Sequence, residues 1–216
     1  MKKVILFLLF VLPCETVFTQ DKDFDKNFKI GVYADGGWNM PVRLTTKYIT
    51  EETSPWYGYG SWSTGVRFSR MLSVNYSIEI AACYSGHKVG FELSPPIYDE
   101  KKIYTETFGI VSIPVTLKRY LQNNFFFSAG TIIDFALEDK PVRLDTQSGF
   151  GLTIGAGRDF RTRRFTLDLA PELQLHSVVP FTEDNYQQRL FVAGFRIGFN
   201  YNFPSTTDSQ AQDNVK

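Results

Sequence analysis

The segment from Phe191 to Phe203 alternates between two kinds of side chain, and this alternation constrains the fold more than any other feature. The apolar parity is Phe191, Ala193, Phe195, Ile197, Phe199, Tyr201 and Phe203, whereas the other parity reads Val192, Gly194, Arg196, Gly198, Asn200 and Asn202. A period of two residues predicts a β-strand. An apolar, aromatic face opposite a face of glycine, amide and charge is typical of a strand that separates lipid from a polar barrel interior.

Seven further segments show the same period, and a tilted transmembrane strand needs about nine to eleven residues. The eight predicted strands are Phe28 to Asp35, Tyr57 to Ser69, Ser73 to Ser85, Ile103 to Arg119, Phe125 to Ala136, Phe150 to Phe160, Phe165 to His176 and Arg189 to Phe203. The first is the shortest.

The connections between these segments alternate in length. Short links are predicted at Arg70 to Leu72, Tyr120 to Asn124 and Arg161 to Arg164, and long links at Gly36 to Trp56, Gly86 to Lys102, Leu137 to Gly149 and Ser177 to Gln188. Short turns at one end and long loops at the other are how outer-membrane barrels are built. The sequence therefore predicts an all-β fold, an eight-stranded antiparallel up-and-down transmembrane β-barrel, with both termini in the periplasm.

The N-terminus has the pattern of a secretory signal: Lys2 and Lys3, an apolar run from Val4 to Leu12, and a polar stretch before Gln20. We expect a signal peptide over 1–19, the barrel over 20–203 and a polar tail over 204–216. Cys14 falls in the signal, where lipidation is the alternative to an ordinary signal cysteine. Cys83 is then alone, so the sequence predicts no internal disulfide.

Glycines and charges predict which face of the strands points inward. The polar parity of the sixth strand carries Gly151, Gly155 and Gly157, which make room inside a narrow eight-stranded lumen but only weaken a solvated exterior. Two arginines on the outward parity, Arg119 and Arg158, fall at turn ends, where they can snorkel to the interface. We therefore expect polar side chains inside and apolar side chains outside.

The fourth strand breaks the pattern, because Tyr104 and Phe108 lie on its inward parity. This predicts a β-bulge near Gly109. Aromatic residues at the strand ends predict two interfacial girdles. The turn-side girdle is Phe28, Phe68, Tyr120, Phe125, Phe160, Phe165 and Tyr201, and the loop-side girdle is Trp38, Trp56, Tyr84, Phe135, Phe150 and Phe191.

The inward parity carries charges of both signs: Arg67, Lys118 and Arg196 against Glu79, Asp134, Asp168 and Glu172. In a narrow lumen we expect these side chains to form a paired network, because an unpaired buried charge is costly. Arg196, Glu79 and Glu172 lie at similar mid-strand heights and are expected to be joined. A small polar pore or a proton path is the functional alternative to a filled interior.

Other chemistry has weak support in the sequence. The 23 basic residues balance the 23 acidic ones, so charge does not favour nucleic acid as a partner. The spaced glycines of GFGLTIGAG lack the strand–helix context of a dinucleotide site, and the few His and Cys residues predict neither a metal site nor a cofactor. His176 and Ser177, the best catalytic candidates with Asp184 and His87, are adjacent on a strand and are expected to point to opposite faces. Arg161, Arg163 and Arg164 form a basic turn that is expected to be solvated, with a lipid phosphate or a periplasmic partner as the alternative.

Three segments resemble the small outer-membrane β-barrel family common in Bacteroidota, often labelled PorT-like: Ser112 to Gly130, Gly149 to Phe160 and Phe195 to Phe203. The resemblance implies an eight-stranded barrel inserted by the outer-membrane assembly machinery, for which a terminal aromatic acts as the signal. Phe203 fits that role, although the polar tail follows it. Some relatives assist protein secretion across the outer membrane.

We therefore expect a non-enzymatic integral protein of the bacterial outer membrane, with a filled polar lumen and loops that make external contacts. Its partners are outer-membrane lipid, the assembly machinery and, in an alternative function, a complex for secretion or transport across the outer membrane. The sequence also leaves open a soluble ligand-binding barrel and a membrane-embedded hydrolase.

Overall fold

A computed structural model describes residues 28–43, 56–93, 102–137, 145–162, 164–182 and 188–203. Eight strands make up almost all of these residues. They are β1 (Phe28–Arg43), β2 (Trp56–Ser73), β3 (Tyr76–Leu93), β4 (Lys102–Tyr120), β5 (Phe125–Ala136), β6 (Gly149–Arg161), β7 (Phe165–Pro180) and β8 (Gln188–Asn202), with a short 3₁₀ turn, η2 (Gln122–Asn124), before β5. Within this part of the chain no helix is long and apolar enough to cross a membrane.

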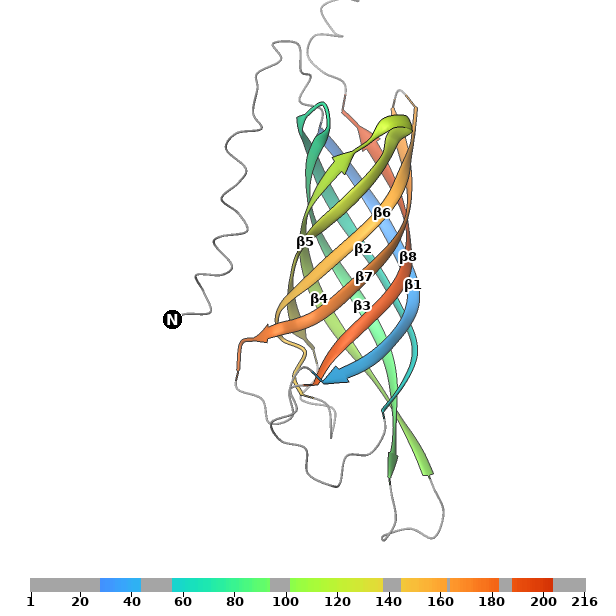
Figure 1. Cartoon of the computed structure of the whole chain (residues 1–216), viewed down its shortest axis with the longest axis vertical. Helices are drawn as coiled ribbons and strands as arrows, with labels where there is room; N and C mark the ends of the chain where they lie inside the picture. The colour runs from blue at the N-terminus through green and yellow to red at the C-terminus, as the bar shows by residue number, and fades with distance from the viewer. Residues whose placement is uncertain are drawn as a thin grey trace, which may run out of the picture.

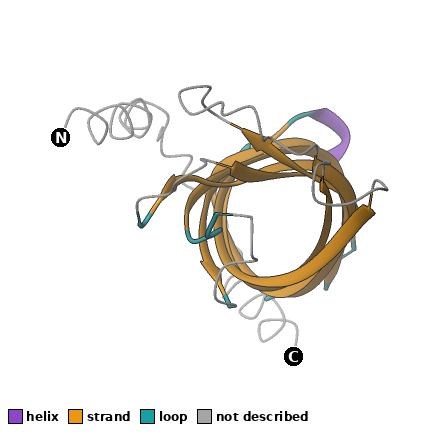
Figure 2. Ribbon diagram, turned by 90° about the horizontal axis from the view of Figure 1, so that it is seen from below, coloured by secondary structure: helices purple, strands orange, loops and turns teal. Residues whose placement is uncertain are grey.

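Each strand pairs antiparallel with its neighbour in sequence, and β1 pairs with β8 to close the barrel. Figure 1 shows the short turns at the upper end of the barrel, which we call the turn end; the opposite ends of the strands lie at the lower end, which we call the loop end. Figure 2 shows the closed ring along its axis. The predicted eight-stranded architecture is confirmed. The first short turn lies at Val74 and Asn75 rather than at Arg70 to Leu72, because β2 continues to Ser73.

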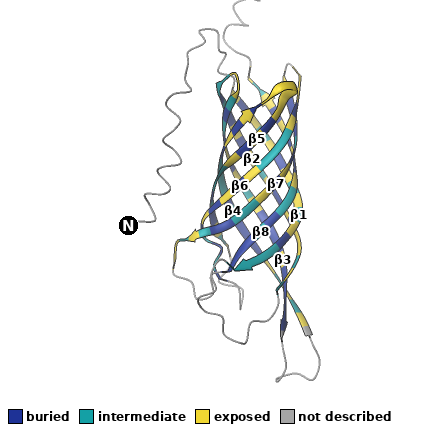
Figure 3. Cartoon of the chain, in the orientation of Figure 1, coloured by how far each residue is buried: buried dark blue, intermediate teal, exposed yellow. Residues whose placement is uncertain are grey.

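Burial alternates along the strands as the orientation argument predicts (Figure 3). On β8, Ile197 and Phe199 are about half exposed on the outer face, whereas Arg196, on the opposite parity, is 5% exposed and faces inward. Most of the large apolar side chains on the outer parity of the other strands are likewise exposed. The apolar face of this barrel therefore points outward, and a soluble barrel, which would bury that face inside, is the wrong interpretation.

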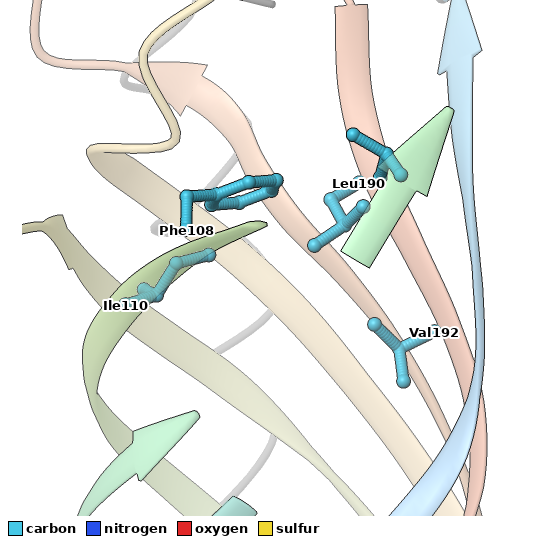
Figure 4. Close-up of a cluster of buried hydrophobic side chains, with 5 residues drawn as sticks. Phe108, Ile110, Leu190 and Val192 are labelled. Atoms are coloured by element: carbon cyan, nitrogen blue, oxygen red, sulfur yellow. The ribbon is translucent and has the colours of Figure 1, made fainter. Parts of the chain in front are cut away.

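The predicted bulge near Gly109 is wrong. The register of β4 is unbroken on both sides, with Gly109 opposite Gly86 on β3 and Ile110 opposite both Ser85 on β3 and Ala136 on β5. Phe108 and Ile110 therefore do point into the lumen. They pack at the loop end with Val89 of β3 and with Leu190 and Val192 of β8, all five at most 4% exposed (Figure 4). We call these five residues the apolar mouth cluster.

An irregularity does occur, but on β7. Phe150 pairs with Val179 and Leu152 pairs with Leu175, so His176, Ser177 and Val178 together face the single residue Gly151. Ser177 has a positive φ of 53°, a backbone conformation that non-glycine residues seldom adopt. The two additional residues of this β7 bulge leave the outward parity of β7 unchanged, since Leu173 and Val179 are both exposed, but they turn the intervening Ser177 inward.

The aromatic girdles are largely where the sequence places them, with two corrections. Phe28, Phe68, Phe125, Phe160, Phe165 and Tyr201 are exposed at the turn end, and Trp38, Tyr84, Phe135 and Phe150 toward the loop end. Tyr120 is instead buried inside the barrel with Met71, Phe126 and Ala170, and Trp56 packs against the apolar mouth cluster. Both lie on inward positions, so neither ring reaches the lipid interface.

Candidate functional site

The middle of the lumen is organised around Arg67 of β2, which is 2% exposed. Two of its guanidinium nitrogens donate to Asp168 of β7: Nη1 to Oδ1 at 3.0 Å, and Nη2 to Oδ2. Its Nε donates to Oδ1 of Asn200 on β8 at 2.7 Å. This two-pronged pairing is the geometry in which a guanidinium binds a carboxylate most strongly.

Glu79 of β3 joins this pair to the remaining charges. Its carboxylate lies 2.7 Å from Nζ of Lys118 on β4, 3.6 Å from Nη1 of Arg67 and 3.5 Å from Nη1 of Arg196 on β8. Arg196 also lies 3.1 Å from Oε2 of Glu172 on β7. Three cations and three anions are therefore linked across the lumen. We call Arg67, Glu79, Lys118, Asp168, Glu172 and Arg196 the central charge network.

Several neutral side chains complete this network, and the sequence pattern did not single them out. Thr153 of β6 donates to Oε1 of Glu172 at 2.6 Å. The ring of Tyr33 on β1 receives two guanidinium groups, with Cζ of Arg67 at 5.8 Å and Cζ of Arg196 at 5.9 Å from its centroid. The inward parity of Thr153 and Tyr33 was enough to predict that they face the lumen. Their partners could not be predicted, because these depend on the stagger between strands around the barrel.

Asp134, the seventh predicted member, lies elsewhere. It accepts a hydrogen bond from Ser112 Oγ at 2.6 Å and lies 3.1 Å from Nδ1 of His176. The backbone N–H of Ser177 also donates to Asp134, at 3.3 Å. Asp134 therefore belongs to a second polar layer, closer to the loop end, which the β7 bulge brings together.

The expectation that His176 and Ser177 point to opposite faces is wrong. The bulge turns both side chains into the interior, where His176 is 2% and Ser177 0% exposed. Within the described part of the chain, however, neither Nε2 of His176 nor Oγ of Ser177 has a hydrogen-bond partner. Nucleophilic catalysis needs a hydrogen bond between nucleophile and base and access for a substrate. Ser177, His176 and Asp134 therefore lie close together in space, but the hydrogen bond from Ser177 to His176 that a nucleophile needs is not formed among the described residues.

Additional groups fill the two ends of the lumen. At the turn end, Asp159 lies 3.8 Å from Nζ of Lys29 and 3.1 Å from Nη2 of Arg161, and accepts a hydrogen bond from Tyr120 at 3.1 Å. Arg161 and Arg164 of the predicted basic turn are both exposed, as expected, and Arg161 in addition pairs with the inward carboxylate of Asp159. At the loop end the apolar mouth cluster fills the interior.

The wall between β7 and β8 at the loop end is closed in an unusual way. The β7–β8 ladder ends at Leu175 and Phe191. Beyond it, the N–H of Leu190 donates to Oε1 of Gln147 at 3.1 Å, and the N–H of Gln188 donates to Oδ2 of Asp145 at 2.9 Å. Side chains of the segment before β6 thus take the place of a neighbouring strand.

A cavity of about 20 Å³ lies between the central charge network and the layer of Asp134, lined among others by Glu172, His176 and Arg196. That volume holds about one water molecule. Among the described residues no cluster of three His, Cys, Asp or Glu side chains could hold a metal ion.

Replacing Arg196 with methionine is expected to lower the free energy of unfolding by about 2–3 kcal/mol, because it leaves buried carboxylate charge without one of its cations. The cost is moderate since Glu79 keeps Lys118 and Glu172 keeps Thr153. Thermal unfolding in detergent, followed by the heat-dependent shift in gel mobility, measures the effect. An unchanged midpoint would contradict a stabilising role for Arg196.

Phe203, the predicted assembly signal, lies at the turn end beside the start of β1. Its N–H donates to the carbonyl of Phe28 at 2.9 Å, and its ring packs against Tyr201 at 5.2 Å between centroids. The assembly-signal role of Phe203 stays a prediction. The signal peptide (1–19), the polar tail (204–216), Arg163 and Asp184 lie outside the described residues.

The sequence matches no known family and no curated protein at a significant level. Solved structures do resemble it. The outer-membrane protein OprG from Pseudomonas aeruginosa superposes with a TM-score of 0.50 at 12% identity, over 84% of this chain and 97% of OprG. The outer-membrane protein AlkL superposes with a TM-score of 0.52 at 7% identity, over 87% of this chain and 95% of AlkL. The fold is that of an eight-stranded outer-membrane β-barrel.

This fold, together with the apolar exterior and the aromatic girdles, places the protein in a bacterial outer membrane as an integral component. Strands that face lipid on one side and a charged interior on the other are stable only in that setting. The outer-membrane lipid is therefore a partner of the protein.

Proposed function

We propose that the protein is a non-enzymatic, non-conducting outer-membrane barrel whose contacts are made at the loop end. The observation that carries this proposal is the filled lumen. The central charge network crosses the middle, the apolar mouth cluster fills the loop end, and the described residues between them leave a cavity for about one water. An eight-stranded barrel is just wide enough for its own side chains, so a path for solute is not provided.

The loop end supplies surface for such contacts. β3 and β4 run beyond the other strands there (Figure 1), and aromatic rings stabilise the extension. Phe91 stacks on Tyr104 at 5.8 Å between centroids and contacts Trp56 at 5.5 Å. A pair of strands that protrudes beyond the rest of the barrel offers surface for contacts at the loop end, which suits a structural or adhesive role.

Conductance across a planar lipid bilayer tests the filled lumen. We expect no stable unitary conductance after insertion of the full-length protein, since ions would have to displace a neutralised and tightly paired set of charges. Folded insertion is verified separately from the heat-dependent gel shift of the same sample. Reproducible channel steps from inserted barrels would overturn the non-conducting assignment and favour a polar pore.

The resemblance to PorT-like barrels of Bacteroidota supports insertion by the outer-membrane assembly machinery, with Phe203 as the signal, as part of the proposed function. Comparing the amount of folded barrel with and without the Phe203 side chain tests the signal directly. An accessory role in secretion is the alternative. It would replace a purely structural role if the protein co-purified, after mild cross-linking, with components of a translocation complex.

A further inference from the structure

Three arginines interrupt the apolar exterior at the turn end of the barrel. Arg70, Arg119 and Arg158 lie on β2, β4 and β6, on the outward parity of each strand and within a few residues of a short connection. Arg119 and Arg158 are exposed and Arg70 is half-buried. The alternate strands β2, β4 and β6 therefore each carry one outward cation near the turn end.

Each of the three guanidinium groups rests on an aromatic ring. Cζ of Arg70 lies 5.0 Å from the centroid of Phe28, and Cζ of Arg119 lies 6.0 Å from that of Tyr76. Cζ of Arg158 lies 5.1 Å from Phe125 and 5.2 Å from Phe160. Aromatic girdles mark the depth at which acyl chains give way to headgroups. The rings thus hold the three cations at headgroup level.

Acidic side chains of the described residues do not pair with these three arginines. Among the described residues, the acidic side chains nearest this end, Asp159 and Asp168, point into the lumen and are at most 3% exposed. Their ion pairs are with Lys29, Arg161, Arg67 and Arg196. No ion pair of the described residues involves the three outward arginines. Toward the loop end, the exposed Lys88 lies on the same strand and parity as Glu92, a carboxylate that is 7% exposed and accepts a hydrogen bond from Tyr57 at 2.7 Å.

We propose that Arg70, Arg119 and Arg158 form a binding surface for the headgroups of anionic phospholipids in the leaflet on the turn side. The planar guanidinium binds a phosphate through two parallel N–H donors. Zwitterionic headgroups carry their own cation, so a cluster of arginines without ion-pair partners among the described residues favours lipids with net negative charge. The gain near a membrane surface is about 1 kcal/mol for each cation, or roughly five-fold in binding.

The test uses the full-length protein in detergent micelles with equal amounts of phosphatidylglycerol and phosphatidylcholine of identical acyl chains. Native mass spectrometry counts the lipids of each kind that remain bound. We expect wild type to retain phosphatidylglycerol preferentially. The triple variant R70Q/R119Q/R158Q should bring the two lipids close to parity, and each single variant should lower the preference by up to roughly five-fold.

Lys88→Gln is the matched control, because Lys88 is an outward cation held over an aromatic ring, Tyr59 at 5.4 Å, but toward the loop end. It should retain the wild-type lipid preference. The proposal is overturned if the triple variant keeps the preference, if Lys88→Gln loses as much of it, or if wild type retains both lipids equally. The gel shift confirms that each variant is folded. If the triple variant does not fold, the three single variants decide the question.

Discussion

Replacing Arg67 with methionine is expected to lower the free energy of unfolding by about 3–5 kcal/mol, the cost of leaving a buried charge without its partner. Arg67 is almost completely buried, holds Asp168 through two nitrogens and also binds Asn200. The substitution leaves Asp168 with the more distant Arg196, at 3.7 Å, as its remaining ion-pair partner among the described residues. Urea unfolding of the barrel in lipid vesicles, followed by tryptophan fluorescence, measures the loss.

A double variant separates lost charge pairing from lost volume. In Arg67→Met/Asp168→Leu both partners are apolar, and the network keeps two cations and two anions. Replacing a buried pair by apolar side chains of similar size is often neutral or stabilising. We therefore expect the double variant to recover most of the stability that the single variant loses. A double variant as unstable as Arg67→Met would show that the pair is not the source of the effect.

Replacing Gly198 with alanine should cost about 3 kcal/mol, an unusually large penalty for adding one methyl group on a strand. A Cβ atom at this position overlaps the guanidinium of Arg67 and comes to 2.5 Å from Oδ2 of Asp168. Arg67 can move away only by giving up its two bonds to Asp168. The same urea titration measures the loss, and we expect reduced stability with the fold retained.

Gly194→Ala is the matched control for this experiment. Gly194 lies on the same strand and the same face, but a Cβ there meets nothing closer than the carbonyl oxygen of Gly36 at 3.1 Å. We expect its effect to stay within about 1 kcal/mol, the range of ordinary strand substitutions. Equal losses in the two variants would mean that Gly198 is needed for the strand rather than for the central charge network.

Much of this architecture could be predicted from the sequence because a barrel strand carries its own signal. The period of two identified each strand and its orientation, and the inward parity identified the charged residues. Partners were harder to predict. Asp134 has the same parity as the members of the central charge network, yet it meets His176, because the stagger between β5 and β7 sets its height.

Local sequence patterns report neither how polar the lumen is at each level nor where the ladder is irregular. Phe108 on an inward position suggested a bulge at Gly109, whereas the lumen itself is apolar at that level. The bulge at Ser177 was not predicted, since serine gives no signal for a positive φ. The assignment of Tyr120 to the lipid interface failed for a related reason, because a ring at a strand end can also turn inward onto Asp159.

The closure by Asp145 and Gln147 has a consequence for how the barrel opens. Between most neighbouring strands, opening the barrel requires breaking a continuous ladder of backbone hydrogen bonds. The β1–β8 ladder, for example, runs from Lys29–Asn202 to Arg43–Gln188. Between β7 and β8 beyond Leu175, a few side-chain bonds hold the rim. Local opening starts where such bonds are fewest. Thermal opening of the barrel should therefore begin between β7 and β8 at the loop end and proceed toward the middle of the barrel. The β1–β8 ladder should stay paired meanwhile.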